Sequence, residues 1–217
     1  MAPAPPHRIL QSPNPPGAEP GAVLFETERL IVRRYLASDA PALAAAANHV
    51  EVSDFMSDRF PSPYTADAAL AFFARHDEAQ DLTHPTHAAV LVKPNTADNP
   101  SSEPRLIGGL GADVLDDILY RTWSLGYFLA PSAWGRGYAT EAVAAFTRWL
   151  FATWPRLNRI EGEAYAHNVA SQRVLEKSGL RREGVRRGAA EKQGVLVDLV
   201  MFGIVRGDLV ETPPPAG

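Results

Sequence analysis

The stretch from residue 123 to residue 150 constrains the fold most, because it predicts a strand, a tight turn and a helix in succession. The segment Trp123–Leu129 is strongly apolar, and Pro131 ends it since proline cannot donate to a sheet ladder. Beyond the turn, apolar side chains recur at helical spacing at Ala139, Ala142, Val143, Phe146 and Leu150. This order of elements predicts an α/β domain built around the turn.

The turn itself, Trp134-Gly135-Arg136-Gly137, has the features of an anion site. Its two glycines permit a tight turn and a close approach of a ligand to the backbone. The first N–H groups of the following helix have no intrahelical partner, and the helix dipole favours negative charge there. Phosphate or pyrophosphate is the natural ligand. The spacing matches neither the dinucleotide fingerprint nor the P-loop, and similar turns occur in proteins that bind no ligand.

Two motifs together carry a resemblance to a known family. Residues 134–142 read Trp-Gly-Arg-Gly-Tyr-Ala-Thr-Glu-Ala, and residues 168–180 read Asn-Val-Ala-Ser-Gln-Arg-Val-Leu-Glu-Lys-Ser-Gly-Leu. The first resembles the acetyl-CoA pyrophosphate loop of the GNAT N-acetyltransferases, especially the RimJ and RimL branch of ribosomal-protein alanine N-acetyltransferases. The second lies at the expected distance downstream. Trp134 departs from the Gln or Arg of the general pattern, but backbone donors do the binding.

The resemblance covers about residues 26–209 and implies the GNAT fold. This fold is a mixed, mostly antiparallel sheet flanked by helices, in which two neighbouring parallel strands splay apart. Those strands contain Gly126–Leu129 and Ile160–Ala164 in this sequence. We expect one GNAT domain over residues 25–210, between Pro-rich tails at 1–24 and 211–217 that are predicted to be disordered.

The remaining pattern supplies further predicted elements. Asn168 is predicted to cap a helix that ends before Gly179, and Gln193-Gly194 to form a hairpin turn. Helices are predicted from Ser38 or Asp39 towards residue 48 and over residues 65–80. Strands are predicted over residues 29–35, 88–93, 105–111, 180–187 and 196–204.

The resemblance also implies direct acetyl transfer from acetyl-CoA within a ternary complex. The pantetheine arm would lie between the splayed strands and bond to strand backbone. The amide of Leu129 would then polarise the thioester carbonyl. The residues expected to bind acetyl-CoA are Leu129, Trp134, Gly135, Arg136, Gly137, Tyr138, Ala139, Thr140, Asn168 and Ser171.

Three residues are predicted to be catalytic. Ser171 matches a serine proposed as the acid in RimL-like enzymes, although capping of the helix explains it equally well. Glu161, on the strand beside the gap, matches a frequently acidic family position, and Glu191 lies near another candidate carboxylate. A water relay could replace either base. Glu141, in the first turn of a helix, is interpreted as structural.

The predicted function is acetylation of a primary amine, with a protein or peptide N-terminal α-amine as the first choice of acceptor. An α-amine, with a reference pKa of about 8, needs less help to lose its proton than a lysine near 10.4. The alternatives are a small-molecule amine acceptor, a non-catalytic acyl-CoA sensor and an unrelated nucleotide-phosphate binder. Three large apolar residues in the loop 52–64, Phe55, Met56 and Phe60, are expected to cover the core or to wall the acceptor pocket.

Composition excludes several other classes. The 217-residue chain has no cysteine, which excludes disulfides, thiolate metal sites and an acyl-cysteine intermediate. A net charge of −4 argues against a general nucleic-acid binder. The sequence has no membrane-spanning segment and no signal peptide, so a cytoplasmic monomer or homodimer is expected.

Two polar groups outside the motifs admit a functional interpretation. His84 and His87 have metal-like spacing, but no further ligands accompany them, and no metal site is predicted. Asp113, Asp116 and Asp117 are expected in a solvated turn, with recognition of an ammonium group as the alternative.

Overall fold

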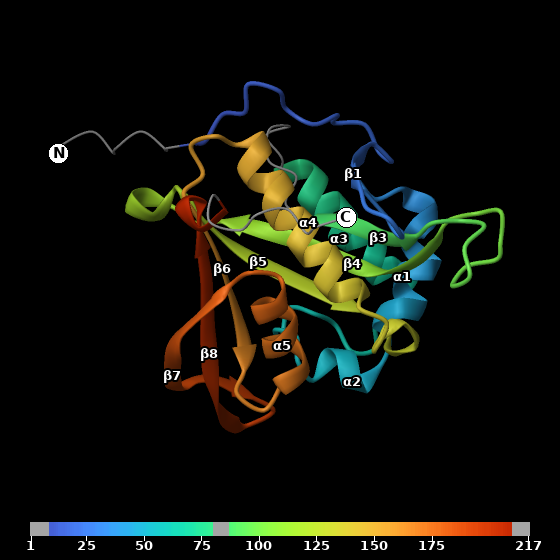
Figure 1. Cartoon of the computed structure of the whole chain (residues 1–217). Helices are drawn as coiled ribbons and strands as arrows, with labels where there is room; N and C mark the ends of the chain where they lie inside the picture. The colour runs from blue at the N-terminus through green and yellow to red at the C-terminus, as the bar shows by residue number, and fades with distance from the viewer. Residues whose placement is uncertain (1–8, 80–86, 210–217) are drawn as a thin grey trace.

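One eight-stranded sheet organises the molecule, with the strand order β1-β2-β3-β4-β5-β6-β8-β7 (Figure 1). The structure is a computed structural model that describes residues 9–79 and 87–209. The strands are β1 Val23–Glu26, β2 Leu30–Arg33, β3 His87–Val92, β4 Arg105–Val114, β5 Thr122–Leu129, β6 Arg159–Tyr165, β7 Arg181–Lys192 and β8 Val195–Val205.

Helices cover both faces of this sheet. In Figure 1, α4 crosses in front of the central strands, α5 lies beside β6 and β8, and α1 and α3 lie behind. The helices are α1 Ala40–Ala47, α2 Val50–Ser53, α3 Ala66–Ala79, α4 Tyr138–Thr153 and α5 Val169–Lys177. The fold class expected from the sequence is therefore confirmed: a mixed, mostly antiparallel sheet with flanking helices.

Each face of the sheet has its own apolar core. The larger cluster lies under α4 and includes its buried residues Val143, Phe146 and Leu150, which are the apolar positions predicted at helical spacing. The smaller cluster joins α1 to α3 through residues such as Leu43, Ala69 and Phe73. Burial on both faces fixes the central strands and so the gap between two of them.

The parallel pair β5–β6 holds together only at its beginning. Thr122, Trp123 and Ser124 pair with Arg159, Ile160 and Glu161, and the register goes no further although both strands continue. All other described pairs are antiparallel. The predicted splay is therefore confirmed, and the gap opens from Leu125 on one side and Gly162 on the other.

The N-terminal segment is more ordered than the predicted tail. Strand β1 begins at Val23, and Leu10 is buried in the larger core. Several contacts hold the segment: Val23–Glu26 pairs with β2, the Ser12 hydroxyl donates to the Thr153 carbonyl at 2.6 Å, and Arg34 Nε donates to the Gly17 carbonyl at 2.6 Å. Residues 1–8 and the predicted tail at 211–217 lie outside the described residues.

The predicted caps and turns agree with the structure. The Asn168 side chain accepts a hydrogen bond from the Ser171 amide at 3.0 Å, and Gly179 has a φ of +96° just beyond α5. Gln193 and Gly194 have φ values of +52° and +79°, which is the geometry of a two-residue hairpin turn. The Gly108 region of β4 carries a bulge against β3, as its glycines indicate.

Candidate active site

A cavity of about 1260 Å³ passes through the gap between β5 and β6. On one side it reaches the N-terminus of α4 and the α5 residues Ser171 and Val174. On the other side it reaches α3 and the loop that precedes it. Two molecules could therefore meet inside the sheet after entering from opposite faces.

The turn between β5 and α4 forms one end of this cavity. Gly135 and Gly137 have φ values of +73° and +80°, in the region that disfavours any side chain. A Cβ added at Gly135 would meet no heavy atom within 4 Å, so the space beside it is open. Both glycines line the cavity. The conformation explains why the sequence needs glycine at both positions.

Backbone donors of α4 point towards the same end. The first helical hydrogen bond runs from the Glu141 amide to the Gly137 carbonyl at 3.0 Å. The amides of Tyr138, Ala139 and Thr140 precede this bond, and all three residues line the cavity. This end can therefore bind an anion through backbone groups, as the sequence predicts.

Glu141 serves to hold this turn in place. Its carboxylate accepts hydrogen bonds from the Thr27 hydroxyl and from Arg29, whose Nε lies 2.8 Å away. Burial acts to raise the pKa of Glu141, but these bonds overcome that effect and the pKa lies below its usual range. A charged, fully engaged carboxylate agrees with the structural interpretation of this residue.

The end of β5 presents backbone to the gap. Because the Ala130 amide donates to the Ile107 carbonyl at 2.8 Å, the alternation of the ladder directs the neighbouring Leu129 amide towards β6. The Trp134 indole donates to the Leu129 carbonyl at 2.8 Å. Trp134, which departs from the family pattern, thus fastens the turn to the strand.

A hydroxyl pair lies inside the gap. The Tyr127 hydroxyl of β5 is 2.9 Å from the Ser171 Oγ of α5, and both residues line the cavity. Burial raises the pKa of Tyr127 to about 12, although the bond to Ser171 acts to lower it. Tyr127 lies outside both sequence motifs and was not among the predicted site residues. The alternation of β5 could have indicated it, because Tyr127 shares a face with buried Leu125 and Leu129.

Two predicted site residues do not line the cavity. The Arg136 guanidinium lies 2.9 Å from the Asp98 carboxylate. Glu161 is held by Arg159 at 3.1 Å, which also binds Glu183 at 2.6 Å. Glu161 lies opposite Ser124, in the last paired register before the strands separate, so its position does not support a role as the base.

Four carboxylates do line the cavity: Asp58, Asp113, Glu163 and Glu191. Glu163 lies two residues beyond Glu161 on the same face of β6, where the gap is open. Glu191, a predicted catalytic residue, comes from β7 opposite Leu196. Asp113 belongs to β4 and not to the turn in which it was expected.

Aromatic side chains wall the end of the cavity away from the glycine turn. Phe55, Met56 and Phe60 all line it, which agrees with the second of the two interpretations of their loop. Phe60 packs against Tyr64 and Phe128, with ring centroids 4.7 Å and 5.3 Å away.

The same loop contacts the β7–β8 hairpin across the mouth of the cavity. Lys192 Nζ lies 2.9 Å from Asp58, and the Gln193 amide donates to Asp54 at 3.0 Å. Asp58 lines the cavity, so this bridge lies at its edge.

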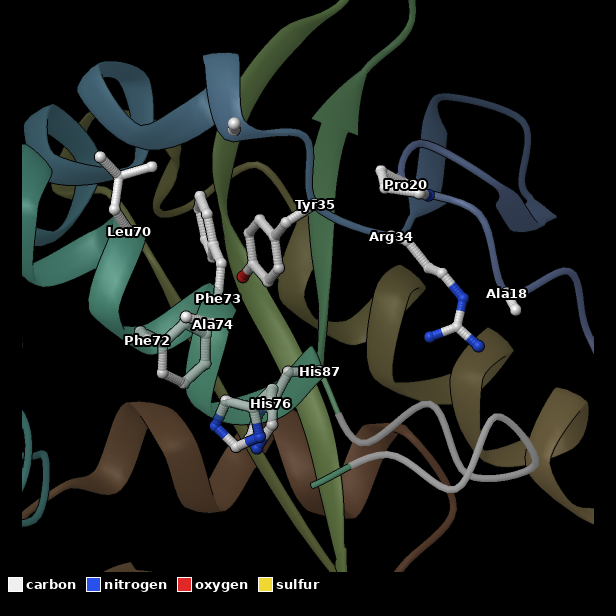
Figure 2. A pocket seen from close by; sticks show the side chains of 11 residues that line it. Ala18, Pro20, Arg34, Tyr35, Leu70, Phe72, Phe73, Ala74, His76 and His87 are labelled. Carbon is white, nitrogen blue, oxygen red and sulfur yellow. The ribbon is translucent and has the colours of Figure 1, made fainter. Parts of the chain in front are cut away.

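Two histidines separate this cavity from a smaller one of about 300 Å³. Figure 2 shows His76 of α3 beside His87 of β3, below the stacked rings of Tyr35 and Phe73. The histidine ring centroids are 3.9 Å apart, and the His87 Nε2 lies 3.7 Å from Asp113 Oδ1. Burial, helped by His87, lowers the pKa of His76 to about 4. Among the described residues, no three side chains are arranged to hold a metal ion.

Comparison with known proteins places this architecture in a family. Residues 29–181 match the model of the acetyltransferase (GNAT) domain. The chain belongs to the GNAT family, and it is an acetyl-CoA-dependent N-acetyltransferase. Within the described ranges, no helix combines the length and apolar character needed to cross a membrane.

Relatives and solved structures agree with this assignment. The chain is 26% identical to the uncharacterized N-acetyltransferase p20 of Bacillus licheniformis over 83% of its own length and 94% of the relative. The ribosomal-protein-S5-alanine acetyltransferase of Vibrio fischeri aligns with a TM-score of 0.69 at 21% identity, covering 85% and 97% of the two chains. RimJ of Mycobacterium smegmatis, in complex with CoA-disulfide, aligns with a TM-score of 0.67 at 20% identity over 94% and 88%. These two likenesses establish the fold.

Proposed function

We propose that this protein transfers the acetyl group of acetyl-CoA to the N-terminal α-amine of a protein or peptide. The observation that carries the proposal is the cavity through the splayed strands. It connects a backbone anion site at α4 with an aromatic pocket on the opposite face. A thioester and an amine that enter from the two faces would meet beside Gly126 and Tyr127, and both residues line this passage.

The cofactor half fits acetyl-CoA. The amides of Gly135, Gly137 and the first turn of α4 would hold the pyrophosphate, and the absence of Cβ atoms leaves room for it. The Leu129 amide would bond to the pantetheine arm along the open edge of β5. Arg173 and Lys177, one turn apart on α5, line the cavity and supply positive charge. Acetyl-CoA itself supplies an activated acyl group with a thiol leaving group.

Tyr127 and Ser171 are suited to protonate that leaving group. A thiol has a reference pKa near 8.5, so its departing thiolate gains from a hydroxyl donor without depending on it. The 2.9 Å bond between the two hydroxyls lets the tyrosine replace a proton that the serine gives up. Since the Asn168 side chain already caps α5, the Ser171 hydroxyl is available for this role.

The acceptor is the finer part of the proposal. The RimJ and S5-alanine acetyltransferase structures share the fold, which supports an α-amine at the end of a polypeptide. A small-molecule amine is the second candidate. The bridge from Lys192 to Asp58 and from Gln193 to Asp54 favours it, because the bridge narrows the mouth through which an acceptor must pass.

Calorimetric titration with acetyl-CoA, with ATP and NAD as controls, tests the cofactor half. Selective micromolar binding is expected, and a folded protein that does not bind acetyl-CoA would refute the proposal. Release of CoA is then measured with alanine-initiated peptides and with small primary amines. Turnover of peptides supports the first candidate, turnover of small amines alone supports the second, and binding without any turnover identifies a sensor.

A further inference from the structure

We propose that His87 is the catalytic base, which takes the proton from the ammonium form of the acceptor, and that Asp113 is its positioning residue. The inference rests on the proposed function and adds a residue that the motifs do not contain. It replaces the carboxylate bases expected from the sequence with an imidazole on a strand outside the splayed pair. Three independent observations carry it: the register of the sheet, the charges around His87 and the surroundings of the carboxylates.

Sheet register aligns His87 with the gap. His87 of β3 pairs with Gly111 of β4, which pairs in turn with Gly126 of β5. With strands about 4.8 Å apart, the His87 and Gly126 backbones lie roughly 10 Å from each other. Gly111 carries no side chain, so the imidazole can extend across it. An imidazole spans about half of that separation, which leaves room for the acceptor nitrogen or one water molecule.

Contacts orient the imidazole in this direction. The His87 Nε2 faces Asp113 Oδ1 at 3.7 Å, and Asp113 lies two residues beyond Gly111 on β4. On the other side the ring packs against Phe72 and His76 of α3, with centroids 5.1 Å and 3.9 Å away. His87, Asp113 and Gly126 all line the same cavity. The side chain is thus held between a helix and a carboxylate, at the edge of the space that an acceptor would occupy.

Charged groups surround the pair of His87 and Asp113. Asp113 of β4 faces the imidazole, Arg59 of the loop before α3 acts on Asp113, and Arg75 of α3 acts on the neighbouring His76. The Asp113 carboxylate stabilises the imidazolium that forms when the proton arrives. His87 in turn holds the pKa of Asp113 below its usual range, so the carboxylate stays ionised.

The cavity carboxylates are less suited to this step. The Glu163 side chain is 50% exposed and lies 3.9 Å from the Arg186 guanidinium. Glu191 is exposed on the β7–β8 hairpin. Solvent, and Arg186 in the case of Glu163, therefore compete with an acceptor ammonium for these carboxylates, whereas the half-buried His87 ring is held between α3 and β4.

The step balances as follows. Because the His87 Nε2 faces the Asp113 carboxylate, it carries the ring hydrogen, and the lone pair of Nδ1 takes one proton from the acceptor ammonium, directly or through one water molecule, which leaves a neutral amine. The amine nitrogen forms a bond to the acyl carbon, the carbon–sulfur bond breaks, and the electron pair leaves with the sulfur. The sulfur takes a proton from the Ser171 hydroxyl, which recovers one from the Tyr127 hydroxyl, and Tyr127 takes its proton back from solvent. The second amine proton passes to solvent, and the imidazolium later releases its own proton to water.

The pH dependence of His87→Gln tests the proposal. We expect kcat/KM for an alanine-initiated peptide to fall about 10-fold at pH 7, because only about a tenth of an amine with a pKa near 8 is neutral at that pH without a base. The loss should shrink to less than about twofold at pH 9.5, because most of the amine is then neutral. A purely structural role would give the same loss at both pH values. The affinity for acetyl-CoA, measured by calorimetry, should not change.

Matched variants complete the experiment. His76→Gln removes the neighbouring ring and should produce a small loss that is independent of pH. Asp113→Asn should give an intermediate loss and should shift the lower limb of the pH profile to lower pH.

The proposal is overturned if Glu163→Gln, and not His87→Gln, shows the loss that disappears at high pH. If the unmodified protein binds acetyl-CoA but turns over no amine, the proposed function has failed; if it turns over amines and His87→Gln is unaffected, only the base assignment has failed.

Discussion

The two ends of the cavity are built in different ways. At the cofactor end the functional groups are backbone amides, placed by one continuous segment that runs from Leu129 to Thr140. At the acceptor end they are side chains from α3, β3, β4, β6, β7 and the loop before α3. The backbone arrangement needs glycines and a helix start at fixed spacing, so it is visible as a motif in the sequence. The side-chain arrangement needs only that distant segments meet in the fold, so it produces no sequence motif.

This difference explains how the ends can vary independently. A backbone site depends on the turn conformation, and nearly any side-chain change at Gly135 or Gly137 is strained at positive φ. A side-chain site can change one residue at a time while the sheet persists. Substitutions at the two ends should therefore differ in the size of their effect and in the property that they change.

Gly137→Val should have the largest effect. The residue has a φ of +80°, and a valine would strain the turn and put bulk where the pyrophosphate is expected to approach. Affinity for acetyl-CoA, measured by calorimetry, should fall by more than about 100-fold. Gly188→Val, at a φ of +55° with open space around it on β7, is the matched control and should bind normally. Unchanged affinity in a folded Gly137→Val protein would remove the basis of the site assignment.

Tyr127→Phe and Ser171→Ala should each lower kcat by about 10- to 100-fold and leave acetyl-CoA affinity unchanged. Both variants break the 2.9 Å bond between the hydroxyls. Since the Ser171 amide, and not its hydroxyl, bonds to Asn168, Ser171→Ala should keep the stability of α5. Asn168→Ala is the comparison and should lower the free energy of unfolding by about 1 kcal/mol. Equal destabilisation by Ser171→Ala would favour a capping role for the hydroxyl instead.

His76 should make the protein less stable as the pH falls from about 6.5 to about 4. Burial lowers its pKa to about 4, whereas the unfolded chain has the ordinary value of 6.5. Within this window the unfolded state binds more protons than the folded state, so acid favours unfolding. Thermal unfolding of the unmodified protein and His76→Gln at pH 7.5, 5.5 and 4.5 measures the effect. Between pH 7.5 and 4.5, the melting temperature of the unmodified protein should fall by a few degrees more than that of His76→Gln. Equal decreases in the two proteins would exclude this source of acid sensitivity.

Lys192→Ala should have the smallest effect, and only on the acceptor. The pair with Asp58 is 2.9 Å long but the aspartate is 80% exposed, so its contribution to stability is small. Loss of the bridge should lower the KM for long peptides about twofold to fivefold and leave that for small amines unchanged. Lys93→Ala, which breaks the 2.9 Å pair with Glu26 at the other edge of the sheet, is the control. An equal change in both kinds of acceptor would show that the bridge does not restrict access.

The sequence predicts the fold, the glycine turn before α4 and the cap of α5, for a physical reason. Helix periodicity, the glycines of the turn and the cap at Asn168 are local features, and each predicts its local structure from neighbouring residues alone. The splayed pair followed from the family resemblance, since no local pattern records where two distant strands stop pairing. The burial of Leu10 could not be predicted, because a single leucine in a Pro-rich segment carries no periodicity.

The acceptor end resists prediction because its residues are brought together by register. Glu161 and Glu163 lie on the same face of β6 and differ only in whether they precede or follow the point of separation. Arg136 lies within the recognised motif, yet its side chain turns to Asp98, a partner 38 residues earlier in the chain. His87, Gly111 and Gly126 form one row only after three strands have paired. Pairing of this kind is visible in a structure and not in a single sequence.

The three paired positions of β5 and β6 join two parts of the sheet, which we call plates. One plate has five strands, β1 to β5, and the other has three, β6, β8 and β7. The short paired segment, the flanking helices and the bridge from the β7–β8 hairpin to the loop before α3 connect them. A ligand that forms hydrogen bonds to both open edges would connect the two plates and restrict their relative motion. Ligand-free protein should therefore exchange its amides fastest along the open edges of β5 and β6, and binding should make the two plates melt as one.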